Sequence, residues 1–256
     1  MKNNKISKTR QNRILEILGE SGEVKVNDLS EEFKVTPITI RRDLDRLAEK
    51  GLVDRIHGGA IVSQKMRDEA SFYDKGSRFV YEKKRIAKAA AELINSGDTI
   101  FMNSGSTTLE LLKNIREKHV RVITNNAAAI NVKTDPQVEL FFVGGEYREA
   151  SNSLVGDMAL SALSQAFSSW TFLGVNGINV DLGLTSSVQQ ETGINRLMVE
   201  NCQGPVVVLA DSSKLGAVSN FPTASISQVS ILVTDSKAEA SQVEMFENIG
   251  IKVILA

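Results

Sequence analysis

The chain has 256 residues, 42% of them hydrophobic, and a net charge of −1, which suggests two domains of ordinary globular composition. A single cysteine, Cys202, excludes a disulfide framework, and two histidines are too few for a histidine-rich metal centre. No apolar run reaches the roughly 18 residues that a membrane helix requires, and the basic N-terminus lacks the apolar core of a signal peptide. We therefore expect a cytoplasmic protein without a metal or other cofactor.

The charge is unevenly distributed along the chain. Residues 1–63 carry 12 Lys+Arg and 10 Asp+Glu, a net of +2, whereas residues 64–256 carry 18 and 21, a net of −3. The first 13 residues hold five basic side chains and no acidic one. A basic N-terminal arm favours a nucleic-acid partner, although a solvated tail has the same composition.

Three helices and a hairpin are predicted within residues 1–63. Apolar residues at helical spacing predict helices over 10–20 and 26–33. A Thr-Pro pair, an N-cap followed by a proline at the first helical position, predicts a third helix over 36–50. Paired glycines at 58–59 predict the turn of a β-hairpin. This order is typical of a winged helix-turn-helix domain, whose third helix lies in the major groove of DNA.

The outer face of the third helix combines hydroxyl, apolar and guanidinium side chains at its N-terminal end. Arginine can pair bidentately with guanine, and isoleucine can contact a thymine methyl group. A solvated surface with an Arg41–Asp45 pair is the alternative, but Arg42 and Arg46 lie four residues apart and repel each other. Together with two hairpin residues, the predicted DNA contacts are Thr36, Ile38, Thr39, Arg41, Arg42, Arg46, Arg55 and His57.

The remaining chain has a different pattern. Residues 64–81 are polar and predicted to form an irregular linker. From residue 82, Val- and Ile-rich strands alternate with helices, which indicates a largely parallel sheet covered on both faces. The predicted strands are 98–102, 120–124, 138–143, 171–175, 206–209, 231–234 and 253–255. We therefore expect an α/β fold: an N-terminal winged helix-turn-helix over 1–63, then a mostly parallel, Rossmann-like α/β domain over 82–256.

Polar residues follow the carboxyl ends of several predicted strands, the edge where ligands of open α/β sheets bind. The loop 104–108 can cradle a phosphate with its N–H groups and hydroxyls at a helix N-terminus. It lacks the lysine of a P-loop, and an ordinary polar turn is the alternative, since Asn and Asp also favour turns. The candidate ligand-binding residues are Ser104, Gly105, Ser106, Thr107, Thr108, Asn125, Gly145, Arg148, Asn176, Glu191, Asp211 and Lys214.

Two segments resemble the DeoR family of bacterial transcriptional regulators: Val-Thr-Pro-Ile-Thr-Ile-Arg-Arg-Asp-Leu at 35–44 and Arg-Ile-His-Gly-Gly-Ala at 55–60. The resemblance continues at 82–87, 104–108, 124–125, 144–145 and 211–214. It implies a C-terminal effector domain similar to ribose-phosphate isomerases and CoA transferases. That domain would bind a phosphorylated sugar or related metabolite, with the phosphate in the 104–108 loop and Lys214 as a cation or hydroxyl contact.

The resemblance implies a repressor of a carbohydrate uptake or catabolic operon that binds double-stranded operator DNA. Because one recognition helix rarely gives operator specificity, we expect a homo-oligomer, a dimer or tetramer, that pairs two half-sites.

Two positions depart from the family pattern. Asn103 and Asn176 are amides where an acidic residue is common, and an amide cannot act as the general base of an aldose–ketose isomerase. We therefore expect binding without turnover and no catalytic residue. The alternative is a sugar-phosphate isomerase-like enzyme with an appended DNA-binding domain. An architectural DNA-binding protein is a third interpretation, disfavoured because such proteins rarely need an α/β domain with a polar pocket.

Overall fold

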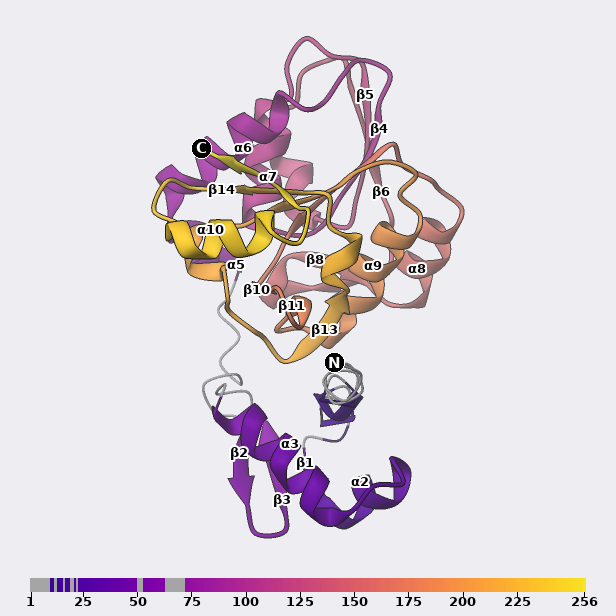
Figure 1. The fold of residues 1–256 in the computed structure, drawn as a ribbon. Coiled ribbons are helices and arrows are strands. Elements are labelled where there is room, and N and C mark those ends of the chain that lie inside the picture. Colours follow the sequence, from indigo (N-terminus) through magenta and orange to yellow (C-terminus); the bar gives the residue numbers. More distant parts are fainter. Residues whose placement is uncertain are drawn as a thin grey trace.

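The computed structural model describes residues 10–11, 13–15, 17–18, 21, 23–49, 53–62 and 72–256. Figure 1 shows a small N-terminal unit of helices and a hairpin below a larger α/β unit. No helix in this described part is both long and apolar enough to cross a membrane.

The small unit is the predicted winged helix. Its named elements are β1 (Glu23–Lys25), α2 (Val26–Glu32), α3 (Pro37–Glu49), β2 (Val53–Ile56) and β3 (Gly59–Val62). The described residues of the predicted first helix, among 10–21, are helical. Strand β1, which the sequence did not predict, pairs antiparallel with β3 and completes a three-stranded sheet in the order β1-β3-β2. The expected helix-turn-helix and hairpin are confirmed.

The large unit is built on a seven-stranded sheet in the order β15-β14-β12-β9-β4-β5-β6, and every pairing in it is parallel. Its strands are β4 (Thr99–Met102), β5 (Val120–Thr124), β6 (Val138–Phe142), β9 (Trp170–Gly174), β12 (Val206–Leu209), β14 (Ile231–Thr234) and β15 (Lys252–Leu255). All seven predicted strands are present, and no end differs by more than one residue.

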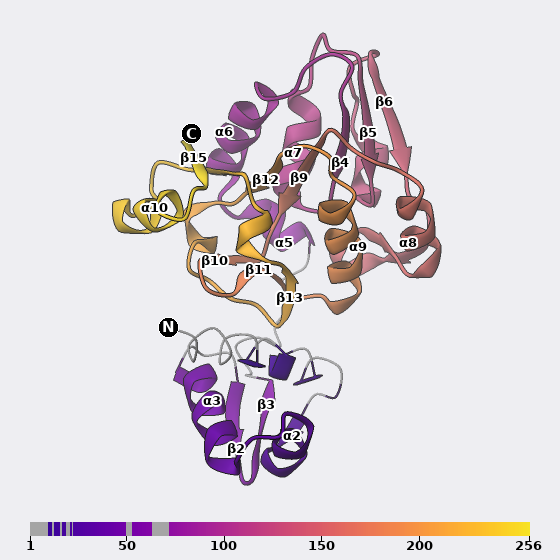
Figure 2. The ribbon, with the colours of Figure 1, turned by 45° about the vertical axis from the view of Figure 1, so that its right-hand side comes forward.

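Helices cover both faces of the sheet (Figure 2). They are α6 (Val80–Ala91), α7 (Ser106–Asn114), α8 (Asp157–Ser164), α9 (Gln189–Glu200) and α10 (Ala240–Glu247). One apolar core contains residues of α6 and α7, and the other contains residues of α8, α9 and α10. Successive strand residues alternate between them: Ile100 and Met102 belong to the first core and Phe101 to the second. The result is the three-layer α/β/α arrangement that the sequence predicted.

Several shorter elements connect the main helices and strands. They are the 3₁₀ turns η1 (Ala127–Asn131), η2 (Glu149–Ser151), η3 (Ser212–Lys214) and η4 (Ile226–Gln228), the ribbon β7 (Glu146–Arg148) and β8 (Ser153–Val155), and β10 (Gly177–Asn179), β11 (Gly183–Ser186) and β13 (Phe221–Ala224). The last three strands form an antiparallel sheet in the order β10-β11-β13. Their sequences, Gly-Ile-Asn, Gly-Leu-Thr-Ser and Phe-Pro-Thr-Ala, contain glycine, asparagine or proline, which are depleted in strands, so the sequence did not predict them.

The expectation of irregular chain throughout 64–81 is wrong in its second half. Helix α5 spans Phe72–Ser77, and α6 begins at Val80; residues 63–71 lie outside the described part. Phe72 is buried, and α5 contacts α7. The five residues after Phe72 are mostly polar, so tertiary contact rather than an amphipathic pattern explains this helix.

The start of α6 is held by an ion pair. Lys237 Nζ donates to Glu82 Oε1 at 2.5 Å. This hydrogen bond lowers the pKa of the Glu82 carboxyl and raises the pKa of the Lys237 amine. The contact joins α6 to the loop after β14 and fixes the helix beside the carboxyl edge of the sheet.

Candidate DNA-binding surface and ligand pocket

Helix α3 presents the predicted DNA-contacting face to solvent. Ile38 is 61% exposed, and Arg41 and Arg42 are exposed beside it. Thr36 caps the helix: its Oγ1 accepts a weak hydrogen bond from Thr39 N at 3.4 Å and lies 3.0 Å from Thr39 Oγ1. An exposed isoleucine among guanidinium groups has no packing role here and suits contact with base edges in a groove.

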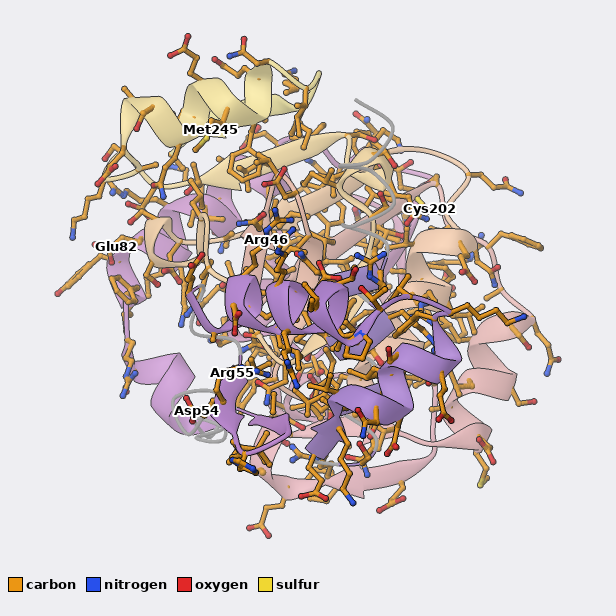
Figure 3. All side chains as sticks on the ribbon, turned by 60° about the horizontal axis from the view of Figure 1, so that its bottom comes forward. Arg46, Asp54, Arg55, Glu82, Cys202 and Met245 are labelled. Atoms are coloured by element: carbon orange, nitrogen blue, oxygen red, sulfur yellow. The ribbon has the colours of Figure 1, made fainter. Side chains whose placement is uncertain are left out.

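The hairpin is tied to α3 through Arg55. Its Nε lies 3.1 Å from Asp45 Oδ1, and its Nη1 donates to Gly59 O at 2.9 Å. Within the described residues Asp45 therefore pairs with Arg55 and not with Arg41, the alternative that helical spacing allowed. In Figure 3, which looks onto the winged helix, Arg46 lies on α3 and Arg55 on the adjacent hairpin. His57 is exposed at the hairpin turn.

A buried carboxylate fixes α3 from its inner side. Asp43 is 2% exposed and lies 2.6 Å from Arg10 Nη2. Arg10 Nε also donates to Asp43 at 2.6 Å, and Gln11 Nε2 donates at 3.0 Å. The sequence alone does not reveal this contact, because a periodic pattern places Asp43 on the helix but does not pair it with residues more than 30 positions away.

A pocket of about 450 Å³ lies at the carboxyl edge of the seven-stranded sheet. The strand order changes direction between β4 and β9, since β5 and β6 lie on one side and β12, β14 and β15 on the other. Such a switch point opens a crevice outside the strand ends. Eight of the predicted ligand-binding residues line it: Ser104, Gly105, Ser106, Thr107, Asn176, Glu191, Asp211 and Lys214.

Two of the other predicted residues are buried behind the pocket wall. Thr108 Oγ1 donates to Asn103 O at 2.7 Å. Asn125 Nδ2 donates to Leu154 O at 3.2 Å and lies 3.5 Å from Ser104 Oγ. Both side chains therefore shape the loop that follows β4, and neither lines the pocket.

The remaining two, Gly145 and Arg148, also lie outside the lining. Gly145 has φ +105°, and a Cβ there would lie 2.5 Å from Val155 O, so glycine is required by the backbone. Arg148 Nη1 donates to Ser151 Oγ at 3.0 Å, and Ser151 does line the pocket. Arg148 therefore acts on the pocket through Ser151.

The loop after β4 forms the N-terminus of α7. Gly105 is its N-cap and has no side chain to accept from the first-turn N–H groups. Ser106 and Thr107, the first residues of that turn, line the pocket. A Cβ on Gly105 would lie 3.2 Å from Gly174 Cα, so glycine allows the β4 and β9 loops to approach closely. A helix N-terminus with open N–H groups favours an anion.

The side-chain amide of Asn103 joins the two central strand ends. Its Nδ2 donates to Gly174 O at 2.8 Å, and its Oδ1 accepts from Gly174 N at 2.9 Å. Nδ2 also donates to Asn195 Oδ1 at 3.1 Å. A carboxylate has no donor for Gly174 O or Asn195 Oδ1, so the amide is a requirement of this bridge.

The other polar residues of the lining have defined partners. Asn176 Oδ1 accepts from Ser187 N at 3.2 Å, and Glu191 Oε1 accepts a weak bond from Ser104 Oγ at 3.4 Å. Asp211 accepts from Ser213 N at 3.2 Å and from the Ser213 hydroxyl. Asp211 thereby caps η3, the turn that ends at Lys214.

The segment from α5 to the start of α6 forms one wall of the pocket, which the sequence did not predict. Phe72, Arg78, Phe79 and Lys83 all line it, and Lys83 is only 6% exposed. Lysine is almost never this buried without a partner or a function. Lys83 belongs to the 82–87 motif of the family resemblance, which singles it out in the sequence. A helical pattern alone, however, does not show that its side chain reaches the strand ends.

The described charges of the lining favour an anion. Three cations, Arg78, Lys83 and Lys214, face two carboxylates, Glu191 and Asp211. The Asp211 carboxylate is engaged by Ser213. No group of three or more His, Cys, Asp or Glu in the described residues could hold a metal ion.

Two buried hydroxyls in the lining have no partner within the described chain. They are Ser187 Oγ and Thr223 Oγ1. Buried polar atoms are nearly always hydrogen-bonded, so these two atoms are suited to a hydroxylated ligand or to ordered water.

A winged helix joined to an α/β domain with a cation-lined pocket at its switch point defines a DNA-binding protein with a small-molecule sensor. Comparisons with known proteins agree. The DeoR-like helix-turn-helix domain model matches residues 10–66, and the DeoR C terminal sensor domain model matches residues 78–236. The chain belongs to the DeoR family.

Named relatives match over nearly the whole chain. A putative aga operon transcriptional repressor of Escherichia coli O157:H7 is 34% identical over 96% of this chain and 93% of its own length. The glycerol-3-phosphate regulon repressor of E. coli K12 is 33% identical, over 96% and 98%. A lactose phosphotransferase system repressor of Staphylococcus epidermidis is 32% identical, over 89% and 91%.

Among solved structures, ribose 5-phosphate isomerase A from Methanocaldococcus jannaschii matches 52% of each chain with 19% identity and a TM-score of 0.37. This likeness is too distant to carry an argument about function. The named relatives are transcriptional regulators, and the chain is accordingly a regulator and not an enzyme.

Replacing Asp43 tests the buried contact behind α3. Asp43→Ala leaves the Arg10 guanidinium and the Gln11 amide without their acceptor, and breaking a buried ion pair costs about 3–5 kcal/mol. Calorimetry of the full chain should show a large drop in the unfolding temperature of the winged helix. Asp45→Ala, which removes an exposed carboxylate from the same helix, should cost only about 0–1 kcal/mol. Equal losses for the two variants would contradict the assignment.

Replacing Asn103 tests the bridge between β4 and β9. Asn103→Asp removes the donor to Gly174 O and sets a carboxylate against two oxygens, so we expect a loss of at least about 1–3 kcal/mol. The control is Asn176→Asp, because a carboxylate can still accept from Ser187 N. The unfolding temperature of the sensor domain should fall much further for Asn103→Asp than for Asn176→Asp. If both variants have the same unfolding temperature, the Asn103 bridge does not stabilise the domain more than an ordinary hydrogen bond does.

Proposed function

We propose that this regulator represses a carbohydrate uptake or catabolic operon and that a phosphorylated sugar, bound in the sensor pocket, changes its affinity for operator DNA. The observation that carries the proposal is the meeting of three cations with the N-terminus of α7 at the switch point of the sheet. The names of the relatives, repressors of the aga operon, of a lactose phosphotransferase system and of a glycerol-3-phosphate regulon, support it.

In this proposal the phosphate binds at 104–107, where α7 supplies N–H groups and hydroxyls. Lys83 and Lys214 supply full positive charges, and charge-assisted hydrogen bonds are about twice as strong as neutral ones. The sugar hydroxyls then contact Asn176, Glu191 and the two unpaired hydroxyls of the lining. The cavity of about 450 Å³ is large enough for a sugar phosphate and lies within the usual range of ligand sites.

The proposed DNA contacts are those of a winged helix. Ile38, Thr39 and the three arginines of α3 would lie in the major groove, while His57 contacts the backbone from the hairpin. Arg55 serves first to hold the hairpin against α3, since Asp45 and Gly59 already engage it. We further propose a cytoplasmic homo-oligomer, dimer or tetramer, with the two functions divided between 1–63 and 82–256.

The isomerase alternative is not favoured. An aldose–ketose isomerase needs a base near the sugar carbons. Asn103 is committed to Gly174 on both its donor and its acceptor sides, and Asn176 is also an amide. Within the described part of the chain, the lining has two acidic residues. Asp211 caps the turn η3, and Glu191 accepts a hydrogen bond from Ser104 in the proposed phosphate loop.

The DNA-reading role of α3 is tested with Arg42. Operator sequences are first selected from random duplex DNA with the wild-type protein. Arg42→Ala should then lose about 1–3 kcal/mol of discrimination between selected and random DNA, because a base-edge contact is lost. Arg85→Ala, which removes the same charge from an exposed position on α6, is the control. Unchanged discrimination between selected and random DNA by the Arg42 variant would show that Arg42 does not contact base edges.

The phosphate site is tested with Lys214. Thermal unfolding is followed with ribose, fructose and tagatose phosphates, glycerol 3-phosphate and inorganic phosphate; a ligand at 100 times its Kd adds about 2.7 kcal/mol. For a compound that stabilises the wild type, Lys214→Ala should weaken binding by about 1.5–3 kcal/mol. Lys252→Ala on β15 is the control. Stabilisation that is identical in both variants and the wild type would place the phosphate elsewhere.

A further inference from the structure

The tip of the β10–β11 hairpin carries a buried leucine. Leu182 lies in the turn between these strands, where a side chain ordinarily projects into solvent, yet it is only 5% exposed. It belongs to the same apolar cluster as Ile14, Leu18 and Leu44 of the winged helix. Figures 1 and 2 both show the winged helix below the sheet formed by β10, β11 and β13. The winged helix is therefore what covers Leu182.

A second residue makes the same contact and also lines the ligand pocket. Val218 packs against the winged-helix cluster, and it belongs to the pocket lining together with Ser219 and Asn220. The segment that contains it begins at Lys214, one of the three cations of the pocket. Four residues of the segment 214–220 thus line the ligand site, and one of them, Val218, also contacts the DNA-binding domain.

Backbone bonds hold this segment to the small antiparallel sheet. Gly216 N donates to Ile178 O at 2.8 Å, and Ser219 N donates to Thr185 Oγ1 at 2.9 Å. Gly216 and Ser219 lie on either side of Val218, so the chain is bonded to the sheet both before and after this residue.

Asn179 extends the connection to the hairpin tip. Its Nδ2 donates to Gly216 O at 3.2 Å, and its Oδ1 accepts from Asp181 N at 2.8 Å and from Leu182 N at 3.2 Å. One side chain therefore binds the segment and orders the turn that carries Leu182.

We propose that residues 179–182 and 214–220, here named the coupling tip, transmit the state of the pocket to the winged helix. The inference rests on the proposed function and adds its mechanism of regulation. A phosphate that draws Lys214 into the pocket shifts 214–220 and, through Asn179, the hairpin tip. Both apolar contacts with the winged helix, at Leu182 and Val218, then change together.

The position of the contact fits this role. The coupling tip touches the apolar core of the winged helix, whereas Ile38 and Arg42 on α3 stay exposed. Docking therefore sets the orientation of α3 without covering its outer face. In an oligomer, that orientation sets the spacing of two recognition helices, and operator affinity depends on this spacing.

The test removes the contact and leaves the pocket intact. Operator affinity of the full chain is measured by fluorescence anisotropy with and without each sugar phosphate, glycerol 3-phosphate and inorganic phosphate. Binding of the same compounds is measured by thermal unfolding. The variants are Leu182→Ser and, should the first fail to fold, Leu182→Ala. Leu255→Ser, which changes an exposed leucine of β15, is the control.

In the wild type and the control, an active compound should change operator affinity by about 5–150-fold, the usual size of allosteric coupling. In the Leu182 variants this ratio should fall to nearly one, while the compound still stabilises the sensor domain as in the wild type. A Leu182 variant that responds like the wild type contradicts the role proposed for the coupling tip but does not affect the proposed function. A wild type that no compound binds or affects overturns the proposed function and the coupling with it.

Discussion

The hydrogen bonds between the Asn103 amide and the backbone of Gly174 are the constraint on which the sensor domain depends. They hold the ends of β4 and β9 together where the strand order reverses. Because these strand ends meet there, the α7 N-terminus and the β9 loop face one pocket. The same bonds explain why the position is an amide, because a carboxylate has no donor for Gly174 O.

The charges of the pocket come from three separate parts of the chain. Arg78 and Lys83 come from the segment that leads into the sensor domain, and Lys214 comes from the turn after β12. Burying Lys83 costs free energy unless an anion or a polar partner compensates. In the proposed function, an anionic ligand would contact both the segment that leads into the domain and the turn after β12.

Much of this architecture could be predicted from the sequence. The seven strands of the central sheet are mostly apolar runs that alternate with helices, and the recognition helix has a Thr-Pro start and a clear apolar face, so local patterns were sufficient. The short strands β10, β11 and β13 and the helix α5 depend on contacts between distant segments, and no local pattern reports them. The same holds for the site: loop 104–107 and Lys214 follow predicted strands, whereas Lys83 reaches the pocket only through the packing of α6. Arg148, Asn125 and Thr108 follow strands too, but their hydrogen bonds hold them outside the lining, and Gly145 is required by the backbone.

The central claim is that the pocket and the DNA-binding surface are thermodynamically linked. Linkage is reciprocal, so a sugar phosphate that changes operator affinity must itself bind the protein–operator complex with an affinity changed by the same factor. Titration of the compound into the protein, with and without saturating operator DNA, measures this directly. We expect two different dissociation constants, and their ratio should equal the ratio of operator affinities with and without the compound. Equal dissociation constants in the two titrations would contradict it.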